Sequence, residues 1–382
     1  MRHASRNAPE PLGVLRGHGA PVNSVSFLSA STIVSGAGDG AVKIWDLKSR
    51  RELATNVVAH SHAGVLHAAA LRGAAASEQK FVTQGRDGLV KLWDVQSFDA
   101  ATDPLATFYC ASHSFTKFAT LRWPSKDSAN SNLIICPSSV DSKLLVFDIR
   151  VKSSSPALTL SVPDAATKRG MCMSLSLFDS SVAKSNDDAG GSVQTYISAG
   201  FEGGQLVILD LRSGGKIACE TTVTQGANAR TYHLRLAFIC YVLKLGACLV
   251  DLVLSVDVTD DGRSVICGSS GHELYEANFD AASYTLHSRS FFTCTHGGFS
   301  SVCIRGDQRI VATAGWDHRV RVFHLRKLKP LAVLKYHSDS VFALDFNGNN
   351  SLLASCSKDR RIALWSIYPP SATAAASSLR PF

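Results

Sequence analysis

The chain has 382 residues, of which 45% are hydrophobic and 18% charged, and its formal net charge is +8. This length is ample to bury a large core, and the abundance of Val, Ile, Ser, Thr and Gly over helix-forming runs favours an all-β fold. The basic residues are scattered or in short clusters, so the positive charge does not favour nucleic acid as a partner.

The stretch from Gly17-His18 to Trp45-Asp46 sets the pattern for the rest of the chain. It predicts a strand at 32–36, a tight Gly-Asp-Gly turn, and a strand at 41–47 that ends on Trp-Asp. A Gly-His, two short strands and a closing Trp-Asp are typical of one blade of a propeller.

The pattern recurs along the chain, with three clear strands in each repeat. In chain order, the expected strands are 22–28, 32–36 and 41–47; 64–71, 80–84 and 89–95; 115–121, 132–137 and 143–149; 171–178, 193–199 and 204–211; 252–258, 264–269 and 272–279; 299–305, 309–314 and 319–325; and 340–346, 351–356 and 361–367. A further strand at 216–224 is assigned to the fifth repeat, and a polar loop is expected at 179–192.

The spacing within the repeats is regular. An acid precedes the closing aromatic by six residues in five pairs: Asp39/Trp45, Asp87/Trp93, Asp141/Phe147, Asp317/Phe323 and Asp359/Trp365. A histidine in the loop before each blade can bond the turn acid, while a Ser or Thr and the indole N–H complete a buried network that helps to specify the strand arrangement. The expected structural network comprises His18, Ser35, Asp39, Trp45, Thr83, Asp87, Trp93, His296, Thr313, Asp317, His337, Ser355, Asp359 and Trp365, with His60 or His62 opening the second repeat and His113 the third.

Seven repeats predict a seven-bladed β-propeller with four strands in each blade. The strand near Leu12–Leu15 is expected to supply the outer strand of the last blade and so to close the ring. The propeller is expected to span 12–368, with disordered segments at 1–11 and 369–382.

Residues 225–251 fit no blade and are expected to be an atypical insertion in blade 5. The apolar run 234–254 resembles a membrane span, but Arg235, Lys244 and Asp251 argue against one because each charge costs about 2.5–3.5 kcal/mol on insertion. Three interpretations stay open: an inserted loop with an apolar partner-binding face, a poorly ordered insertion, and translated non-coding sequence.

Several kinds of chemistry are disfavoured. No phosphate-binding loop, nucleophile elbow or His-Glu-x-x-His motif occurs, so no enzymatic activity and no cofactor are expected. The ten cysteines form no Cys-x-x-Cys pair, which favours buried free thiols over disulfides or a metal site. The first residues lack the apolar core of a signal peptide, so a cytoplasmic and nuclear location is expected.

Protein partners are the favoured ligands. The residue before each turn acid is expected to point out of one rim of the ring, and large or charged residues there are good interface anchors. The candidate partner-binding residues are Arg86, Phe201, Phe299, Trp316 and Lys358.

Several motifs are specific beyond the general repeat, among them Ile33-Val-Ser-Gly-Ala-Gly-Asp-Gly, Thr313-Ala-Gly-Trp-Asp-His-Arg-Val-Arg-Val-Phe323 and Ser357-Lys-Asp-Arg-Arg-Ile-Ala-Leu-Trp. With them the chain resembles the WD40-repeat family of guanine-nucleotide-binding-protein β-subunit-like and ASTRA-associated proteins, whose plant member is called "decreased size exclusion limit". The resemblance implies a non-catalytic scaffold in chromatin regulation and in the maturation of phosphatidylinositol-3-kinase-related kinases with co-chaperone components. For the plant member it implies roles in plasmodesmal transport and embryo development.

An alternative comes from Phe147-Asp-Ile-Arg150 and Leu209-Asp-Leu-Arg212. Both look like the Trp-Asp-x-Arg box by which some WD40 proteins dock to a cullin-4 ubiquitin-ligase adaptor, although both lack the Trp. In that alternative the chain is a substrate receptor, with Arg150 and Arg212 reaching the adaptor.

Overall fold

The structure of the chain is a computed structural model. It describes residues 9–71, 79–110, 115–122, 130–140, 143–151, 153–163, 169–182, 192–223 and 251–367. The predicted terminal segments 1–11 and 369–382 lie largely or wholly outside these residues, as do His113, Asp141 and nearly all of 225–251.

The described chain forms seven four-stranded antiparallel sheets, and these are the predicted blades. Blade 1 contains β2 (Val22–Phe27), β3 (Thr32–Ala37), β4 (Val42–Asp46) and β5 (Arg51–Asn56). Blade 2 contains β6 (Val65–Ala70), β7 (Lys80–Gly85), β8 (Leu89–Asp94) and β9 (Ala106–Tyr109). Blade 3 contains β10 (Ala119–Thr120), β11 (Leu133–Pro137), β12 (Lys143–Asp148) and β13 (Leu158–Ser161).

The other blades follow the same order from the inside of the ring outward. Blade 4 contains β14 (Cys172–Val182), β15 (Ser192–Phe201), β16 (Gln205–Asp210) and β17 (Lys216–Thr222). Blade 5 contains β18 (Val253–Val258), β19 (Ser264–Ser269), β20 (Glu273–Asp280) and β21 (Thr285–Thr293). Blade 6 contains β22 (Phe299–Ile304), β23 (Ile310–Gly315), β24 (Arg319–His324) and β25 (Lys329–Lys335). Blade 7 contains β26 (Val341–Phe346), β27 (Leu352–Ser357), β28 (Arg361–Ser366) and β1 (Gly13–Arg16).

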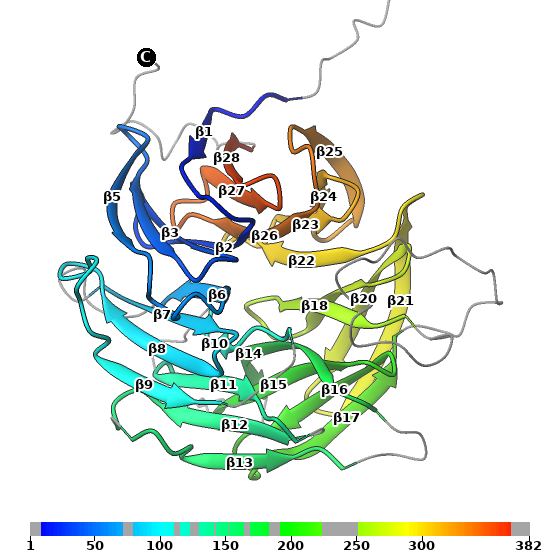
Figure 1. The fold of residues 1–382 in the computed structure, drawn as a ribbon. Coiled ribbons are helices and arrows are strands. Elements are labelled where there is room, and N and C mark those ends of the chain that lie inside the picture. Colours follow the sequence, from blue (N-terminus) through cyan, green and yellow to red (C-terminus); the bar gives the residue numbers. More distant parts are fainter. Residues whose placement is uncertain are drawn as a thin grey trace, which may run out of the picture.

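The N-terminal strand closes the ring, as predicted. β1 pairs antiparallel with β28, with Gly13 opposite Leu364 and Arg16 opposite Arg361. The outer strand of blade 7 therefore comes from the start of the chain, and the other three come from its end (Figure 1). This arrangement ties the first and last repeats together and protects the edge of β28.

The core is divided among the contacts between neighbouring blades. For example, Leu15, Val25 and Trp45 pack with Ala354 and Leu364 between blades 7 and 1. Close approach of the blades requires small residues: a Cβ on Gly36 in β3 would lie 2.3 Å from Cγ1 of Val65, the first residue of the next inner strand. Strands in the middle of a blade are buried on both faces, as in β23, where every residue is buried, and these faces pack against the neighbouring blades.

The structure differs from three expectations near blades 4 and 5. The strand at 216–224 belongs to blade 4, where β17 pairs with β16, and blade 5 is completed instead by β21. The segment predicted as an insertion in blade 5 therefore connects blades 4 and 5. The expected loop at 179–192 is shorter, because β14 and β15 continue their pairing as far as Val182 and Ser192.

Candidate interaction surface

Blade 2 contains the complete buried network. His60 Nδ1 lies 2.9 Å from a carboxylate oxygen of Asp87, and His60 Nε2 lies 2.8 Å from Thr83 Oγ1. The Trp93 indole N–H donates to the same hydroxyl at 2.8 Å. Since the hydroxyl accepts from Trp93, it can donate to Nε2, and the other ring nitrogen then donates to Asp87. Each group in the chain of hydrogen bonds is therefore satisfied with a neutral histidine.

Blade 7 repeats this arrangement. His337 lies 2.9 Å from Asp359 and 2.8 Å from Ser355 Oγ, to which Trp365 donates at 2.9 Å. Burial raises the pKa of Asp359, but the hydrogen bond with His337 and those from the backbone N–H groups of Ser338 and Arg361 outweigh it and leave that pKa below its usual range. The network thus holds the turn acid in its ionised form.

In blade 1 the network is only partly formed. His18 Nε2 lies 2.7 Å from Ser35 Oγ, which also accepts from Trp45 at 2.8 Å. The expected link to Asp39 is absent, since His18 Nδ1 is buried without a hydrogen-bond partner among the described residues. The Asp39 carboxylate instead accepts the backbone N–H of Ala41 at 3.1 Å. Burial, together with the charge of Lys43, lowers the pKa of His18 to about 4.

In blade 6 a different residue holds the turn, and the prediction for His296 is wrong. The guanidinium of Arg321 forms a bidentate pair with Asp317, with Nη1 3.0 Å from Oδ1. His296 is exposed and lies 3.0 Å from the hydroxyl of Thr295. The closing residue, Phe323, has no N–H to offer, and the buried hydroxyl of Thr313 has no hydrogen-bond partner in the described part of the chain.

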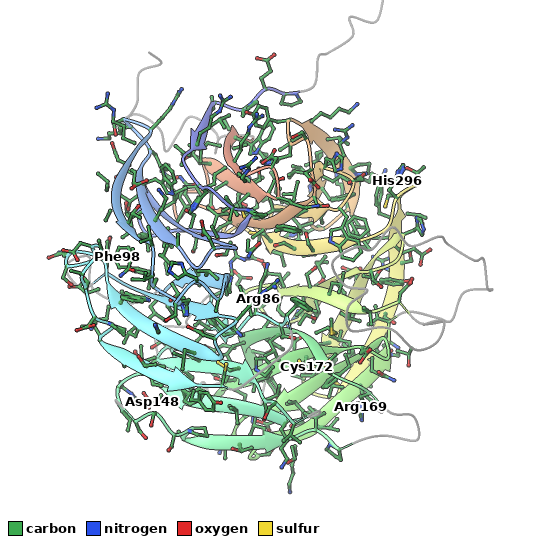
Figure 2. All side chains as sticks on the ribbon, viewed as in Figure 1. Arg86, Phe98, Asp148, Arg169, Cys172 and His296 are labelled. Atoms are coloured by element: carbon green, nitrogen blue, oxygen red, sulfur yellow. The ribbon has the colours of Figure 1, made fainter. Side chains whose placement is uncertain are left out.

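The turns of blades 1, 2, 6 and 7 place equivalent residues on a common rim. The residue before the turn acid donates its backbone N–H to a carbonyl of the preceding loop: Gly38 to Pro21, Arg86 to Gly64, Trp316 to Gly298 and Lys358 to Ser340, at 2.8–3.0 Å. These repeated bonds fix the backbone from which the rim side chains project. Figure 2 shows Arg86 close to the middle of the ring.

Three of the predicted rim residues have accessible side chains. Arg86 is exposed, and its guanidinium lies 5.1 Å from the ring centre of Phe115, itself 39% exposed. Lys358 is exposed, with Nζ 3.6 Å from a carboxylate oxygen of Asp339.

Trp316 is partly exposed and rests on a glycine. A Cβ on Gly298 would lie only 1.9 Å from the Trp316 ring, and Gly298 has a φ of +96°. Both features require glycine at this position, and its lack of a side chain lets the indole of Trp316 pack directly on the backbone.

The prediction that Phe201 and Phe299 project from the rim is wrong. Their exposed fractions are 0% and 1%. Phe201 is the last residue of β15, and Phe299 is the first of β22 and lies opposite Gly315, so both occupy core positions. The rim residue of blade 4 is Glu202, whose N–H donates to the Met171 carbonyl at 2.9 Å; the turn spacing, rather than aromatic character, is the signal that identifies it.

A second polar cluster, absent from the sequence predictions, spans the inside of the ring. The Arg122 guanidinium donates to Asp257 at 2.9 Å, to Cys303 Sγ at 2.9 Å and to Asp345 at 3.2 Å. Burial raises the pKa of Asp257 despite the charge of Arg122, and it raises the pKa of Cys303 to about 11. Arg122 follows β10 of blade 3, and its guanidinium thus links that blade to the inner strands of blades 5, 6 and 7.

The two arginines of the alternative docking motif lie at the opposite end of the strands. Arg150 has a side chain that is 61% exposed and is paired with Asp148 at 2.6 Å. Arg212 is exposed, and its backbone N–H donates to Asp210 at 2.9 Å. In these turns the closing Asp caps the backbone that follows it.

The fold and the repeated network define a WD40-repeat β-propeller. The model of the WD domain, G-beta repeat, matches residues 9–46, 288–324 and 328–366. A solved β-propeller domain of Cps50 (Swd1) from Myceliophteria thermophila aligns with a TM-score of 0.64 at 14% identity and covers 94% of this chain and 99% of that one. Among the described residues there is no helix with the length and apolar character needed to cross a membrane.

The chain has homologues under two names. It is 29% identical to the mouse guanine nucleotide-binding protein subunit beta-like protein 1, covering 94% of this chain and 97% of the relative. It is 26% identical to ASTRA-associated protein 1 of Schizosaccharomyces japonicus, covering 94% and 99%. For ASTRA-associated protein 1 of Penicillium rubens the identity is 27%, and the coverage is 90% and 82%.

Proposed function

We propose that the chain is a non-catalytic scaffold of an ASTRA-type assembly, acting in chromatin regulation and in the maturation of phosphatidylinositol-3-kinase-related kinases. The observation that carries the proposal is its similarity, over nearly the whole of both chains, to proteins named ASTRA-associated protein 1. WD40 propellers commonly serve as platforms for protein partners, and this one presents a rim of accessible side chains on fixed turns.

The geometry indicates how such a scaffold binds. Arg86, Trp316 and Lys358 project from turns whose backbones are already fixed by hydrogen bonds, so little backbone entropy is lost when a partner docks. Trp and Arg are also the residue types most often found to dominate interface energetics. We therefore assign the partner-binding surface to this rim.

The test is affinity purification of the tagged full-length chain from its own cells, with the bound proteins identified by mass spectrometry. Recovery of ASTRA-type or kinase-maturation components by the natural chain, and their loss from an Arg86→Glu, Trp316→Ala, Lys358→Glu variant with an unchanged melting temperature, is the expected result. The matched control changes Lys48→Glu, Arg51→Glu and Leu53→Ala, which are exposed positions of blade 1 away from the rim. Failure to recover any such component would overturn the assignment to this assembly.

A second candidate is a substrate receptor of a cullin-4 ubiquitin ligase. It is supported by the exposure of Arg150 and Arg212 at the same end of two neighbouring blades. Co-purification of the ligase adaptor, abolished by Arg150→Ala with Arg212→Ala, is the expected outcome for this candidate; a purified complex without the adaptor argues against it.

The cellular location proposed for the scaffold is the cytoplasm and nucleus. Plasmodesmal and embryonic roles stay predictions from the sequence resemblance. Imaging of the fluorescently tagged chain expressed from its own promoter tests both, since accumulation restricted to another compartment would contradict the proposal.

A further inference from the structure

The charge of the molecule is concentrated in one blade. Residues 299–335, which form blade 6, contain eight Arg and Lys residues but only two Asp residues, so this blade has a net charge of +6 against +8 for the whole chain. The neighbouring blade 5, residues 251–293, contains seven Asp and Glu residues and two Arg residues. Two adjacent blades therefore carry strong and opposite charge.

Both acids of blade 6 are neutralised within the blade. Asp317 pairs with Arg321, and Asp307 pairs with the buried Arg305 at 2.6 Å. Six cations remain, and within the described residues none of them forms an ion pair: Arg309, Arg319, Arg326, Lys327, Lys329 and Lys335. Their charge is available to an external anion.

These cations gather on the outer edge of the blade. Arg326 and Lys327 lie in the turn that leads into the outermost strand, β25, which begins at Lys329 and ends at Lys335. The Leu325 N–H donates to the carbonyl of Arg309 at 2.8 Å, which brings Arg309 to this turn. At the other end, Arg319 lies opposite Lys335. We define these six residues as the basic edge.

We propose that the basic edge binds an acidic segment of a partner protein. Charge complementarity argues for an anionic ligand, because six cations without internal partners repel one another until an anion neutralises them. The length of β25, about 20 Å, matches a short extended peptide better than a duplex.

The acidic residues of blade 5 restrict an anionic ligand of the basic edge to about the length of β25. Asp260, Asp261 and Asp280 are exposed on blade 5, and the Asp260 N–H lies 3.3 Å from the side-chain oxygen of Gln308, next to Arg309. A continuous phosphate backbone that extends past blade 6 would meet these carboxylates. A peptide whose acidic residues end at the blade boundary would not.

Side-chain charge, rather than strand addition, provides the recognition. Pro330 removes one backbone donor from β25, and the pairing of β24 with β25 shifts its register between Val322 and Phe323. Proline, bulges and lysines are the devices by which edge strands avoid pairing with another strand. The residues changed in the test, Arg326, Lys327 and Lys329, lie at the end of β24 and β25 opposite to Arg319 and the turn of Trp316, so the two surfaces can be tested separately.

The experiment measures binding of fluorescein-labelled decaglutamate to the full-length chain by fluorescence anisotropy. The test variant is Arg326→Glu, Lys327→Glu, Lys329→Glu. The control, Lys48→Glu, Arg51→Glu, Lys216→Glu, makes the same change in net charge at exposed positions of blades 1 and 4. A second test variant, Arg326→Gln, Lys327→Gln, Lys329→Gln, removes the charge without reversing it. The melting temperature of each variant shows whether it is folded.

We expect the test variant to weaken decaglutamate binding by about tenfold or more, and the control by less than about threefold. Equal weakening by both would overturn the proposal, because it would reflect net charge alone, and so would a natural chain that does not bind decaglutamate. Tighter binding of an oligothymidylate of the same length than of decaglutamate would also overturn it, in favour of a nucleic acid.

Discussion

In blade 7 the turn acid, Asp359, is held by His337, whereas in blade 6 the equivalent Asp317 is held by Arg321. The histidine pair is almost fully buried, with side chains 1% and 3% exposed, but the arginine pair is 11% and 12% exposed. In blade 7 the indole of Trp365 completes the network, while in blade 6 Phe323 leaves a threonine without a hydrogen-bond partner among the described residues. One turn geometry can therefore be maintained by two chemistries of different burial.

The difference also changes what the blade presents to solvent. In blade 6 the histidine, His296, is exposed to solvent. The rim residue is Trp316, whose ring packs against Gly298. The same blade carries most of the net charge of the molecule. Blade 6 has thus departed from the structural repeat at the turn that carries Trp316, while blades 2 and 7 retain the full network.

The largest expected effect separates the two turn acids. Asp359→Ala should lower the free energy of unfolding by about 3 kcal/mol, since it leaves a buried histidine without its partner. Asp317→Ala should cost about 1 kcal/mol, because Arg321 is close enough to the surface to reach water. Urea unfolding of both variants at pH 7 gives the comparison, and equal losses would contradict it.

An identical substitution at two equivalent positions sharpens the comparison. Thr83→Val should destabilise by about 2 kcal/mol, because His60 and Trp93 both lose the hydroxyl between them. Thr313→Val should be neutral or stabilise by up to about 1 kcal/mol, because this hydroxyl is buried without a partner in the described structure. The thermal midpoints of the two variants decide the matter; a comparable loss from Thr313→Val would show that its hydroxyl is satisfied.

The partial network of blade 1 predicts a dependence on pH. Burial lowers the pKa of His18 to about 4, so the unfolded chain binds a proton first as the pH falls from 6.5. Stability from this group is therefore lost between pH 6.5 and 4, and the loss from pH 7 to pH 5 should be about 2 kcal/mol. In His18→Gln, unfolding free energies at the two pH values should differ by about 2 kcal/mol less than in the natural chain. Parallel pH profiles would rule out this role.

Much of the fold follows from the local pattern of the sequence. The three inner strands of each blade are largely apolar and buried, as in β3 and β23, and many end at recognisable turns, so their number and the ring closure were predictable. The outer strands carry a weaker signal, because they are largely exposed, as in β5 with its first three residues in solvent. This is why the strand at 216–224 was assigned to the wrong blade and β21 was missed.

The site was predictable only where one repeat contains all of its parts. The networks of blades 2 and 7 use a spacing visible in the sequence, whereas Arg321 replaces a histidine from another loop. Phe201 and Phe299 show that the sequence does not reveal whether an aromatic residue beside a turn projects from the rim or packs in the core. The contacts of Arg122 join residues 135, 181 and 223 positions apart, and no local pattern indicates such a meeting across the ring.

The most direct test of the central claim, that Trp316 of blade 6 is the main anchor of the partner-binding rim, compares Trp316→Ala with Lys358→Ala at equivalent rim positions. Each tagged full-length variant is purified from its own cells, and the recovery of partners by mass spectrometry is measured beside the melting temperature. We predict that Trp316→Ala removes most of the recovered partner at an unchanged melting temperature, and that Lys358→Ala removes a smaller part of it. Equal recovery from both variants, or a melting temperature lowered by Trp316→Ala as much as by Thr83→Val, would contradict the claim and identify Trp316 as a packing residue.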